Sequence, residues 1–217
     1  MIGGALPGVA LGAIAVALAL TAAQEAAIVP ADQEAVLSRA DMARSKGDSA
    51  APVRMVEVSD FECPFCAEFY RETLPAIQRE YIETGKVQYI WVAFPNPNHM
   101  RAWAAVEAGF CAGAAGKFWE MHDMLFDRQA AWTVLPDPPA VFAGYAEEIG
   151  IEAESFARCL REDLTAPLQV SDLQNIVRGG IGSTPFFVLG DSVAISGAAQ
   201  FEDFAAAIDT LLILRAN

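Results

Sequence analysis

The chain has 217 residues, of which 54% are hydrophobic and 19% are charged, so most of it carries enough apolar material for a folded core and is not intrinsically disordered. Its 28 acidic and 14 basic residues give a formal net charge of −14. Because such a chain repels phosphate at long range and contains no run of Lys and Arg, we expect no nucleic-acid partner.

Residues 1–23 form the most apolar stretch of the chain. No charged residue lies between Ile2 and Ala23, and the stretch ends in small residues of the kind that a signal peptidase accepts. It predicts a secretory signal peptide, although no Lys or Arg precedes the apolar run. A membrane anchor is the second interpretation, since about 20 apolar residues can span a bilayer, and a buried helix is the third. Either of the first two interpretations predicts a protein of the periplasm or cell envelope.

Residues 24–50 show no clear strand pattern, and we interpret them as a tether with one short helix. Residues 53–58 are β-rich and predict a buried strand. A helix should begin at Pro64, with Phe65 on the same face as later apolar residues, and should be kinked at Pro75. Residues 87–94 predict a second strand, which completes a βαβ unit.

From residue 99 to 179 the apolar periodicity is helical throughout. Strand signals return at residues 185–189 and 192–196, which flank a Gly190-Asp191 turn and predict a hairpin. An amphipathic helix over residues 201–214 ends the pattern. The sequence therefore predicts an α/β fold over residues 51–217, in which βαβ and ββα halves (51–98 and 180–217) are separated by an all-helical insertion (99–179).

Cys63 and Cys66 form a C-x-x-C pair at the predicted junction between strand and helix, a pattern typical of a redox pair. A thiol at a helix N-terminus faces unpaired N–H groups and the positive end of the helix dipole, which stabilise its thiolate. We therefore predict that Cys63 is the attacking thiol and Cys66 the resolving thiol. A zinc site is the alternative, but no His lies at a ligand-like spacing from any Cys.

Cys111 and Cys159 are isolated in predicted helices. In an exported protein with an even number of cysteines, the simplest interpretation is a structural disulfide between them. Two buried free thiols are the alternative.

Two motifs resemble those of the DsbA family of thioredoxin-fold oxidoreductases. They are residues 60–66, Asp-Phe-Glu-Cys-Pro-Phe-Cys, and residues 182–187, Gly-Ser-Thr-Pro-Phe-Phe. Residues 117–123, Lys-Phe-Trp-Glu-Met-His-Asp, are also similar to bacterial members. The resemblance extends from Ala51 to the C-terminus and implies that the α/β fold is a thioredoxin fold with a helical insertion.

The resemblance also implies roles for residues outside the cysteine pair. Thr184-Pro185 would be the cis-proline loop beside Cys63, and Glu57 would be the buried acid that relays protons to the resolving thiol. An ordinary trans turn at Thr184-Pro185 and a paired structural carboxylate at Glu57 are the alternatives. The best-known oxidant of the family has a histidine at the position of Phe65.

The aromatic and histidine residues near these motifs allow simpler interpretations. Phe61 and Phe65 either pack in the fold or form a peptide-binding rim. We interpret His99 as a loop residue and His122 as a helix-surface or capping residue, neither of them catalytic.

These observations predict an exported, monomeric thiol:disulfide oxidoreductase. It would accept electrons from reduced secreted polypeptides through a mixed disulfide at Cys63, with no cofactor besides the cysteine pair. The resemblance implies that a quinone-linked membrane partner reoxidises the pair. A reductase or isomerase of the same fold, and a non-catalytic binding module on a thioredoxin scaffold, are the alternatives.

Overall fold

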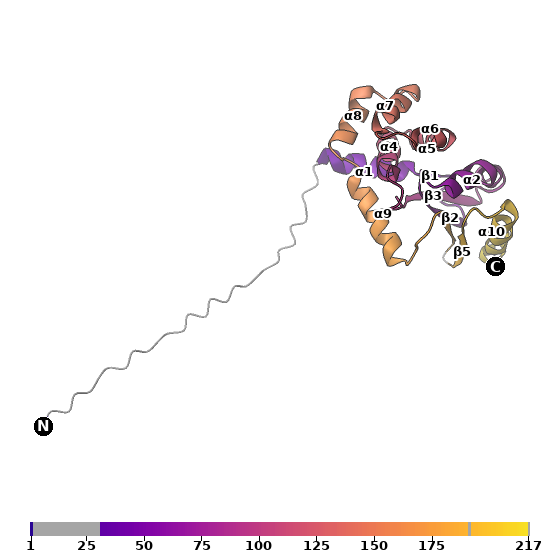
Figure 1. The fold of residues 1–217 in the computed structure, drawn as a ribbon. Coiled ribbons are helices and arrows are strands. Elements are labelled where there is room, and N and C mark those ends of the chain that lie inside the picture. The colour runs from indigo at the N-terminus through magenta and orange to yellow at the C-terminus, as the bar shows by residue number, and fades with distance from the viewer. Residues whose placement is uncertain (2–30, 191, 217) are drawn as a thin grey trace.

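The structure is a computed structural model that describes Met1, residues 31–190 and residues 192–216. Within these residues, five strands form one mixed sheet in the order β1-β3-β2-β4-β5, with helices on both faces (Figure 1). The strands are β1 (Ser45–Lys46), β2 (Val53–Ser59), β3 (Val87–Ala93), β4 (Phe186–Leu189) and β5 (Val193–Ser196).

Strand β2 lies at the centre of the sheet. It runs parallel to β3, with Glu57 opposite Trp91, and antiparallel to β4, with Glu57 opposite Phe187. Strand β4 then pairs with β5 in the predicted hairpin. Because side chains alternate along a strand, Met55, Glu57 and Ser59 all point to the same face of the sheet. The predicted α/β class, with its βαβ and ββα halves, is confirmed.

One face of the sheet is covered by the helices of these two halves. They are α2 (Pro64–Glu72), α3 (Leu74–Ile77), the π-helical segment η1 (Gln78–Ile82) and α10 (Phe201–Ala216). Each contributes buried side chains to one cluster with Met55, Tyr89 and Phe187. The predicted kink at Pro75 is a break, since α2 ends before Thr73 and α3 starts after it. Phe65 does not share the buried face, because it is 58% exposed.

The insertion consists of helices, as predicted. They are α4 (Ala102–Ala114), α5 (Phe118–Asp127), α6 (Gln129–Trp132), α7 (Pro139–Glu148), α8 (Ala153–Arg161) and α9 (Ala166–Arg178). Helix α9 packs on the sheet face opposite α2 and α10 (Figure 1), where Ile176 contacts Val58 and Phe94. The remaining insertion helices form a second core that reaches Phe61 and Trp91 beside the cysteine pair.

The prediction of a tether over residues 24–50 is wrong for the part that the structure describes, residues 31–50. Residues 31–43 form helix α1 (Ala31–Ala43), whose Val36 and Ala40 are buried in the core of the insertion. Helices α1 and α4 pack closely at this point, because a Cβ atom on Gly113 of α4 would lie 3.4 Å from Ala40, at van der Waals contact. Strand β1 then pairs antiparallel with β3. These residues are part of the folded unit because their burial depends on partners far along the chain.

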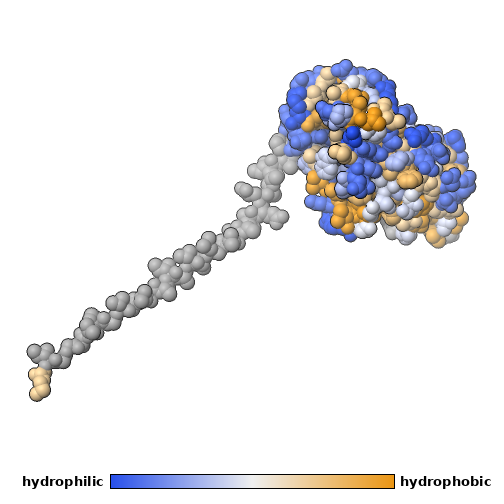
Figure 2. Space-filling model, viewed as in Figure 1, coloured by the Kyte–Doolittle hydropathy of each residue, from blue (hydrophilic) through white to orange (hydrophobic). Residues whose placement is uncertain are grey.

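Of the segment predicted as a signal peptide or membrane anchor, residues 2–23 lie outside the described residues. Among the described residues, no helix is both long and apolar enough to cross a membrane. Hydrophilic side chains cover much of the folded face seen in Figure 2, with separate apolar patches between them.

Candidate active site

The loop between β2 and α2 is held by a buried carboxylate. Asp60 is fully buried and accepts hydrogen bonds from the backbone N–H of Glu62 (2.8 Å) and of Asn96 (2.9 Å). His99 Nδ1 lies 2.6 Å from the same carboxylate. The clamp joins this loop to the loop after β3, and it places Cys63 at the N-cap of α2.

At that position Cys63 meets the start of the helix. Its carbonyl accepts the N–H of Ala67 (3.2 Å), Pro64 occupies the first helical turn, and the backbone N–H groups of Phe65 and Cys66 are near enough to the Cys63 sulfur to lower its pKa. The helix thus begins where the sequence predicted it, with the first cysteine just outside it.

The two thiols differ in their surroundings. Both are free in this structure; Cys66 is completely buried, and Cys63 is 4% exposed. A hydrogen bond from the Cys66 thiol, together with the N–H groups of the first turn, lowers the pKa of Cys63 to about 6. Burial, followed by the interaction with Cys63, raises the pKa of Cys66 well above its usual value. Cys63 is therefore the thiol that carries a thiolate near neutral pH.

The loop before β4 lies beside the reactive thiol. The Thr184–Pro185 peptide bond is cis, and the Cys63 thiol donates to the Thr184 carbonyl at 3.5 Å. The fold thus brings Cys63 next to Thr184 and Pro185, three residues proposed from the sequence, although Cys63 and Thr184 are 121 positions apart in the chain.

Glu57 lies beneath the thiols on the same sheet face. It is buried, and this burial raises its pKa to about 7 in spite of the hydrogen bond that Tyr89 Oη donates to its carboxylate. The negative charge of Glu57 in turn contributes to the raised pKa of Cys66. Glu57 is thus a group that can give or take a proton near pH 7, and its charge acts on the resolving thiol.

Three residues near the thiols were not identified from the sequence. Tyr89 is the hydrogen-bond partner of Glu57. The Ser59 hydroxyl is buried without a hydrogen-bond partner at standard geometry, yet it is near enough to Glu57 and Cys66 to lower both pKa values. Gln129, from the insertion, binds two backbone carbonyls of the active-site loop. Strand alternation would have placed Tyr89 and Ser59 on the buried face, but it does not reveal their polar partners.

The two histidines and Phe61 pack or form hydrogen bonds around the active-site loop. His99 is a loop residue, as expected, and binds Asp60. His122 is buried rather than at the helix surface: aromatic rings surround it, including Phe61 and Tyr70, and burial lowers its pKa. Phe61 packs on Trp91 with ring centroids 4.5 Å apart. Within the part of the chain that the structure describes, no group of three or more His, Cys, Asp or Glu residues could hold a metal ion.

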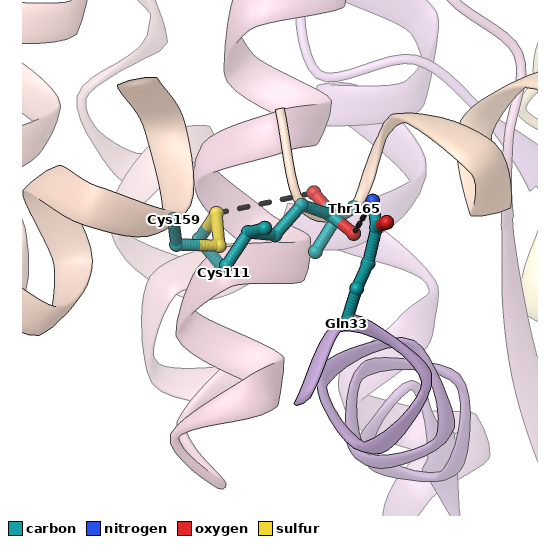
Figure 3. Close-up of a disulfide and its surroundings, with 5 residues drawn as sticks. Gln33, Cys111, Cys159 and Thr165 are labelled. Carbon is teal, nitrogen blue, oxygen red and sulfur yellow. Dashed lines mark hydrogen bonds between the residues drawn. A yellow bond between two sulfur atoms is a disulfide. The ribbon is translucent and has the colours of Figure 1, made fainter. Parts of the chain in front are cut away.

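Cys111 and Cys159 form a disulfide that joins α4 to α8 (Figure 3). The Cα atoms lie 5.9 Å apart, and the bond closes a loop with a sequence separation of 48 residues. Thr165 lies beside it, with its hydroxyl 3.9 Å from the Cys111 sulfur. Gln33 of α1 donates to the Leu164 carbonyl nearby (3.3 Å), so α1, α4, α8 and the start of α9 meet at this disulfide.

Comparisons with known proteins agree with this arrangement. A family model described as thioredoxin matches residues 39–210. The crystal structure of Wolbachia pipientis alpha-DsbA1 superposes with a TM-score of 0.71 at 24% identity, over 80% of this chain and 92% of that chain.

Two curated relatives are longer proteins. The Na(+)/H(+) antiporter NhaA 1 of Salinispora arenicola is 33% identical over 147 residues, which are 67% of this chain and 21% of the antiporter. A putative protein-disulfide oxidoreductase, RC0029 of Rickettsia conorii, is 24% identical over 168 residues, 76% of this chain and 59% of that protein. The chain thus spans about a fifth of the first relative and three-fifths of the second. The match over residues 39–210 and the superposition lead to one conclusion: the chain belongs to the thioredoxin family and has the fold of the DsbA proteins.

Proposed function

We propose that this protein is a thiol:disulfide oxidoreductase that introduces disulfides into exported polypeptides. The observation that carries the proposal is the pair of unequal thiols: Cys63 at a helix N-terminus with a pKa of about 6, and Cys66 buried with a raised pKa. A thiol of low pKa is a good leaving group, and its thiolate stabilises the reduced form of the pair. Both effects favour the transfer of a disulfide from this protein to its substrate.

The reaction starts from the Cys63–Cys66 disulfide. A substrate thiolate attacks the Cys63 sulfur, the bond between the two cysteines breaks, and Cys66 leaves as a thiolate that takes a proton from Glu57. A second substrate thiolate then attacks the substrate sulfur of the mixed disulfide, and Cys63 leaves as a thiolate. Two electrons pass to the protein, and the substrate acquires one disulfide.

The buried acid and the loop at residue 184 support individual steps of this reaction. With a pKa of about 7, Glu57 can protonate Cys66 near neutral pH and be reprotonated from solvent. The backbone of Thr184, next to the Cys63 sulfur, can pair with an extended substrate segment by strand addition and hold the substrate sulfur in line.

The proposal includes the environment and the partners of the protein. The substrates are reduced secreted polypeptides, a quinone-linked membrane partner reoxidises the Cys63–Cys66 pair, and the protein acts as a monomer in the periplasm or cell envelope after export by the segment 1–23. The cysteine pair is the only redox group in the cycle, without a separate cofactor.

The test is oxidation of a reduced two-cysteine peptide by the fully oxidised protein. We expect stoichiometric peptide oxidation by the parent and none by Cys63→Ser. When reduced Cys66→Ala is mixed with the oxidised peptide instead, the Cys63 thiolate should attack the peptide disulfide, release one peptide sulfur as a thiolate and leave a mixed disulfide that no Cys66 thiol can resolve. Reduction of insulin by the parent without peptide oxidation would favour the reductase alternative. Peptide binding with no thiol exchange would favour the binding module.

A further inference from the structure

The active-site loop receives a hydrogen-bond donor from outside the thioredoxin half of the molecule. Gln129 is the first residue of α6, in the insertion. Its Nε2 atom donates to the carbonyl of Phe61 (2.7 Å) and to the carbonyl of Cys63 (3.0 Å). Because a side-chain amide has two N–H donors, both are used on this loop.

The backbone of Gln129 is held by contacts within the insertion. Arg128 binds the Glu148 carboxylate through both terminal nitrogens (2.9 and 2.6 Å). Trp132, at the other end of α6, is fully buried, and its Nε1 donates to the Leu125 carbonyl (2.8 Å). The amide of Gln129 thus projects from a fixed support.

The two carbonyls that Gln129 binds lie on either side of Glu62. The Cys63 carbonyl is also the acceptor for the first backbone hydrogen bond of α2, so its orientation fixes where the Cys63 sulfur lies relative to the N–H groups of the helix. The positive end of the amide dipole also offsets the negative ends of these two carbonyls close to the sulfur. Both effects favour a thiolate at Cys63.

We propose that Gln129 is a positioning residue for thiol–disulfide exchange: its amide holds the backbone on both sides of Glu62 and so keeps the Cys63 sulfur at the N-terminus of α2. The expected effect on the rate of exchange rests on the proposed function. The expected effect on the Cys63 thiolate does not. The insertion then acts on the chemistry of the thiol through one side chain.

Two variants of opposite chemistry, one with the length of glutamine and one a single methylene longer, test the proposal. Gln129→Glu keeps the size of the side chain but replaces the donors by a carboxylate, which is repelled by both carbonyls. Gln129→Lys supplies N–H donors together with a positive charge. Ala130→Glu is the control, because residue 130 is exposed on the same helix and the substitution adds the same charge without touching the loop.

The readout is the thiolate of Cys63, followed by its ultraviolet absorbance and by its rate of alkylation against pH in the reduced protein. We expect Gln129→Glu to raise the Cys63 pKa by about one unit, a tenfold loss of thiolate at low pH. Gln129→Lys should leave it at or below the parent value, and Ala130→Glu should leave it unchanged. If Gln129→Glu fails to fold, Gln129→Met, which has the same length and no donor, replaces it and should also raise the pKa.

The outcomes separate this inference from the proposed function. An unchanged pKa in both Gln129→Glu and Gln129→Met, or equal shifts in Gln129→Glu and Ala130→Glu, would overturn the role of Gln129. A rise in Gln129→Lys equal to that in Gln129→Glu would also overturn it, since packing alone would then explain the effect. If the pKa shifts as expected while the parent oxidises no peptide, the positioning role stands and the proposed function fails.

Discussion

The two cysteine pairs of this protein differ in the length of chain between the cysteines and in their position relative to a helix N-terminus. Cys63 and Cys66 are separated by two residues at the start of α2, whereas Cys111 and Cys159 join two helices across a sequence separation of 48 residues. A disulfide of the second kind removes much conformational freedom from the unfolded chain. A disulfide of the first kind closes a very short loop, and its environment instead stabilises one of the thiols as a thiolate. The difference shows that loop length and the position relative to a helix N-terminus decide whether a pair holds a fold together or exchanges.

The largest effect that we expect follows from opening the longer loop. The double variant Cys111→Ala/Cys159→Ala should lower the free energy of unfolding by up to about 4 kcal/mol, the chain-entropy value for such a loop. Urea unfolding of the otherwise oxidised protein measures it. The comparison fails if Cys63→Ala/Cys66→Ala, the matched control, costs as much as the variant in the insertion.

A pH series separates the reduced from the oxidised active-site pair. The pKa of Cys63 in the folded protein is about 6, below its ordinary value of 9.0. A lowered pKa contributes stability that is present above pH 9 and is lost as the pH falls through 6. We therefore expect the reduced form to melt above the oxidised form at pH 8, and the gap to shrink toward pH 5.

The oxidised form has no Cys63 thiol, so it is the internal control for this series. Glu57 contributes to both forms and largely cancels in the difference. A higher melting temperature for the oxidised protein at pH 8 would contradict the assignment of the pair as an oxidant.

Removal of the buried acid should slow the exchange step without opening the fold. Glu57→Gln should reduce the rate of peptide oxidation at pH 7 by about 100-fold, a typical contribution of a positioned acid.

The raised pKa of Glu57, about 7, contributes stability that is present below pH 4.5 and lost as the pH rises through 7. Glu57→Gln has no such loss. The melting temperature of Glu57→Gln minus that of the parent should therefore be more positive at pH 8 than at pH 5. Stopped-flow oxidation and thermal melts measure the two effects, and an unchanged rate would leave Glu57 with a structural role.

The smallest effect concerns the partner of that acid. Tyr89→Phe removes the hydroxyl that donates to Glu57 and lowers its pKa. The pKa of Glu57 should rise further above 7, so the pH at which peptide oxidation slows should move upward by less than one unit, with a rate change of a few-fold at most. A pH–rate profile of Tyr89→Phe beside Glu57→Gln tests this, and a downward movement would contradict the assigned hydrogen bond.

Much of the fold could be predicted from the sequence because its patterns are local. Strands β2 and β3 and the final hairpin agree with the predicted ranges to within one residue at each end, since alternation and turn residues mark them directly. One short helix was expected within residues 24–50, but the burial of α1 and the pairing of strand β1 could not be recognised, because both depend on distant partners. Arg44, just after α1, forms an ion pair with Asp172 that crosses 128 positions of the chain.

The candidate site also divides into residues that local sequence patterns mark and residues that only the tertiary fold brings together. The spacing of Cys63 and Cys66 marks the thiols, and a family resemblance pointed to Glu57 and Thr184-Pro185. The side chains that adjust these groups depend on sheet register and on the approach of the insertion. Tyr89 is opposite Met55 in the register, and Gln129 is 66 residues from Cys63. His122 was expected as a helix-surface or capping residue, but it lies buried inside α5, because the aromatic residues around it form a core that only the tertiary fold assembles.

Strand β1 has a consequence for the aggregation of shortened forms of the protein. Its two residues pair with Tyr89 and Ile90, and the Arg44 carbonyl accepts the N–H of Trp91 at 3.1 Å. Together they cover the outer edge of β3, which is rich in β-branched and aromatic residues. A chain that began at Ala51 would keep every residue of the thiol chemistry but would present this edge to other molecules, and unpaired edges of this kind recruit further strands. The short segment before the thioredoxin half therefore protects the sheet from self-association.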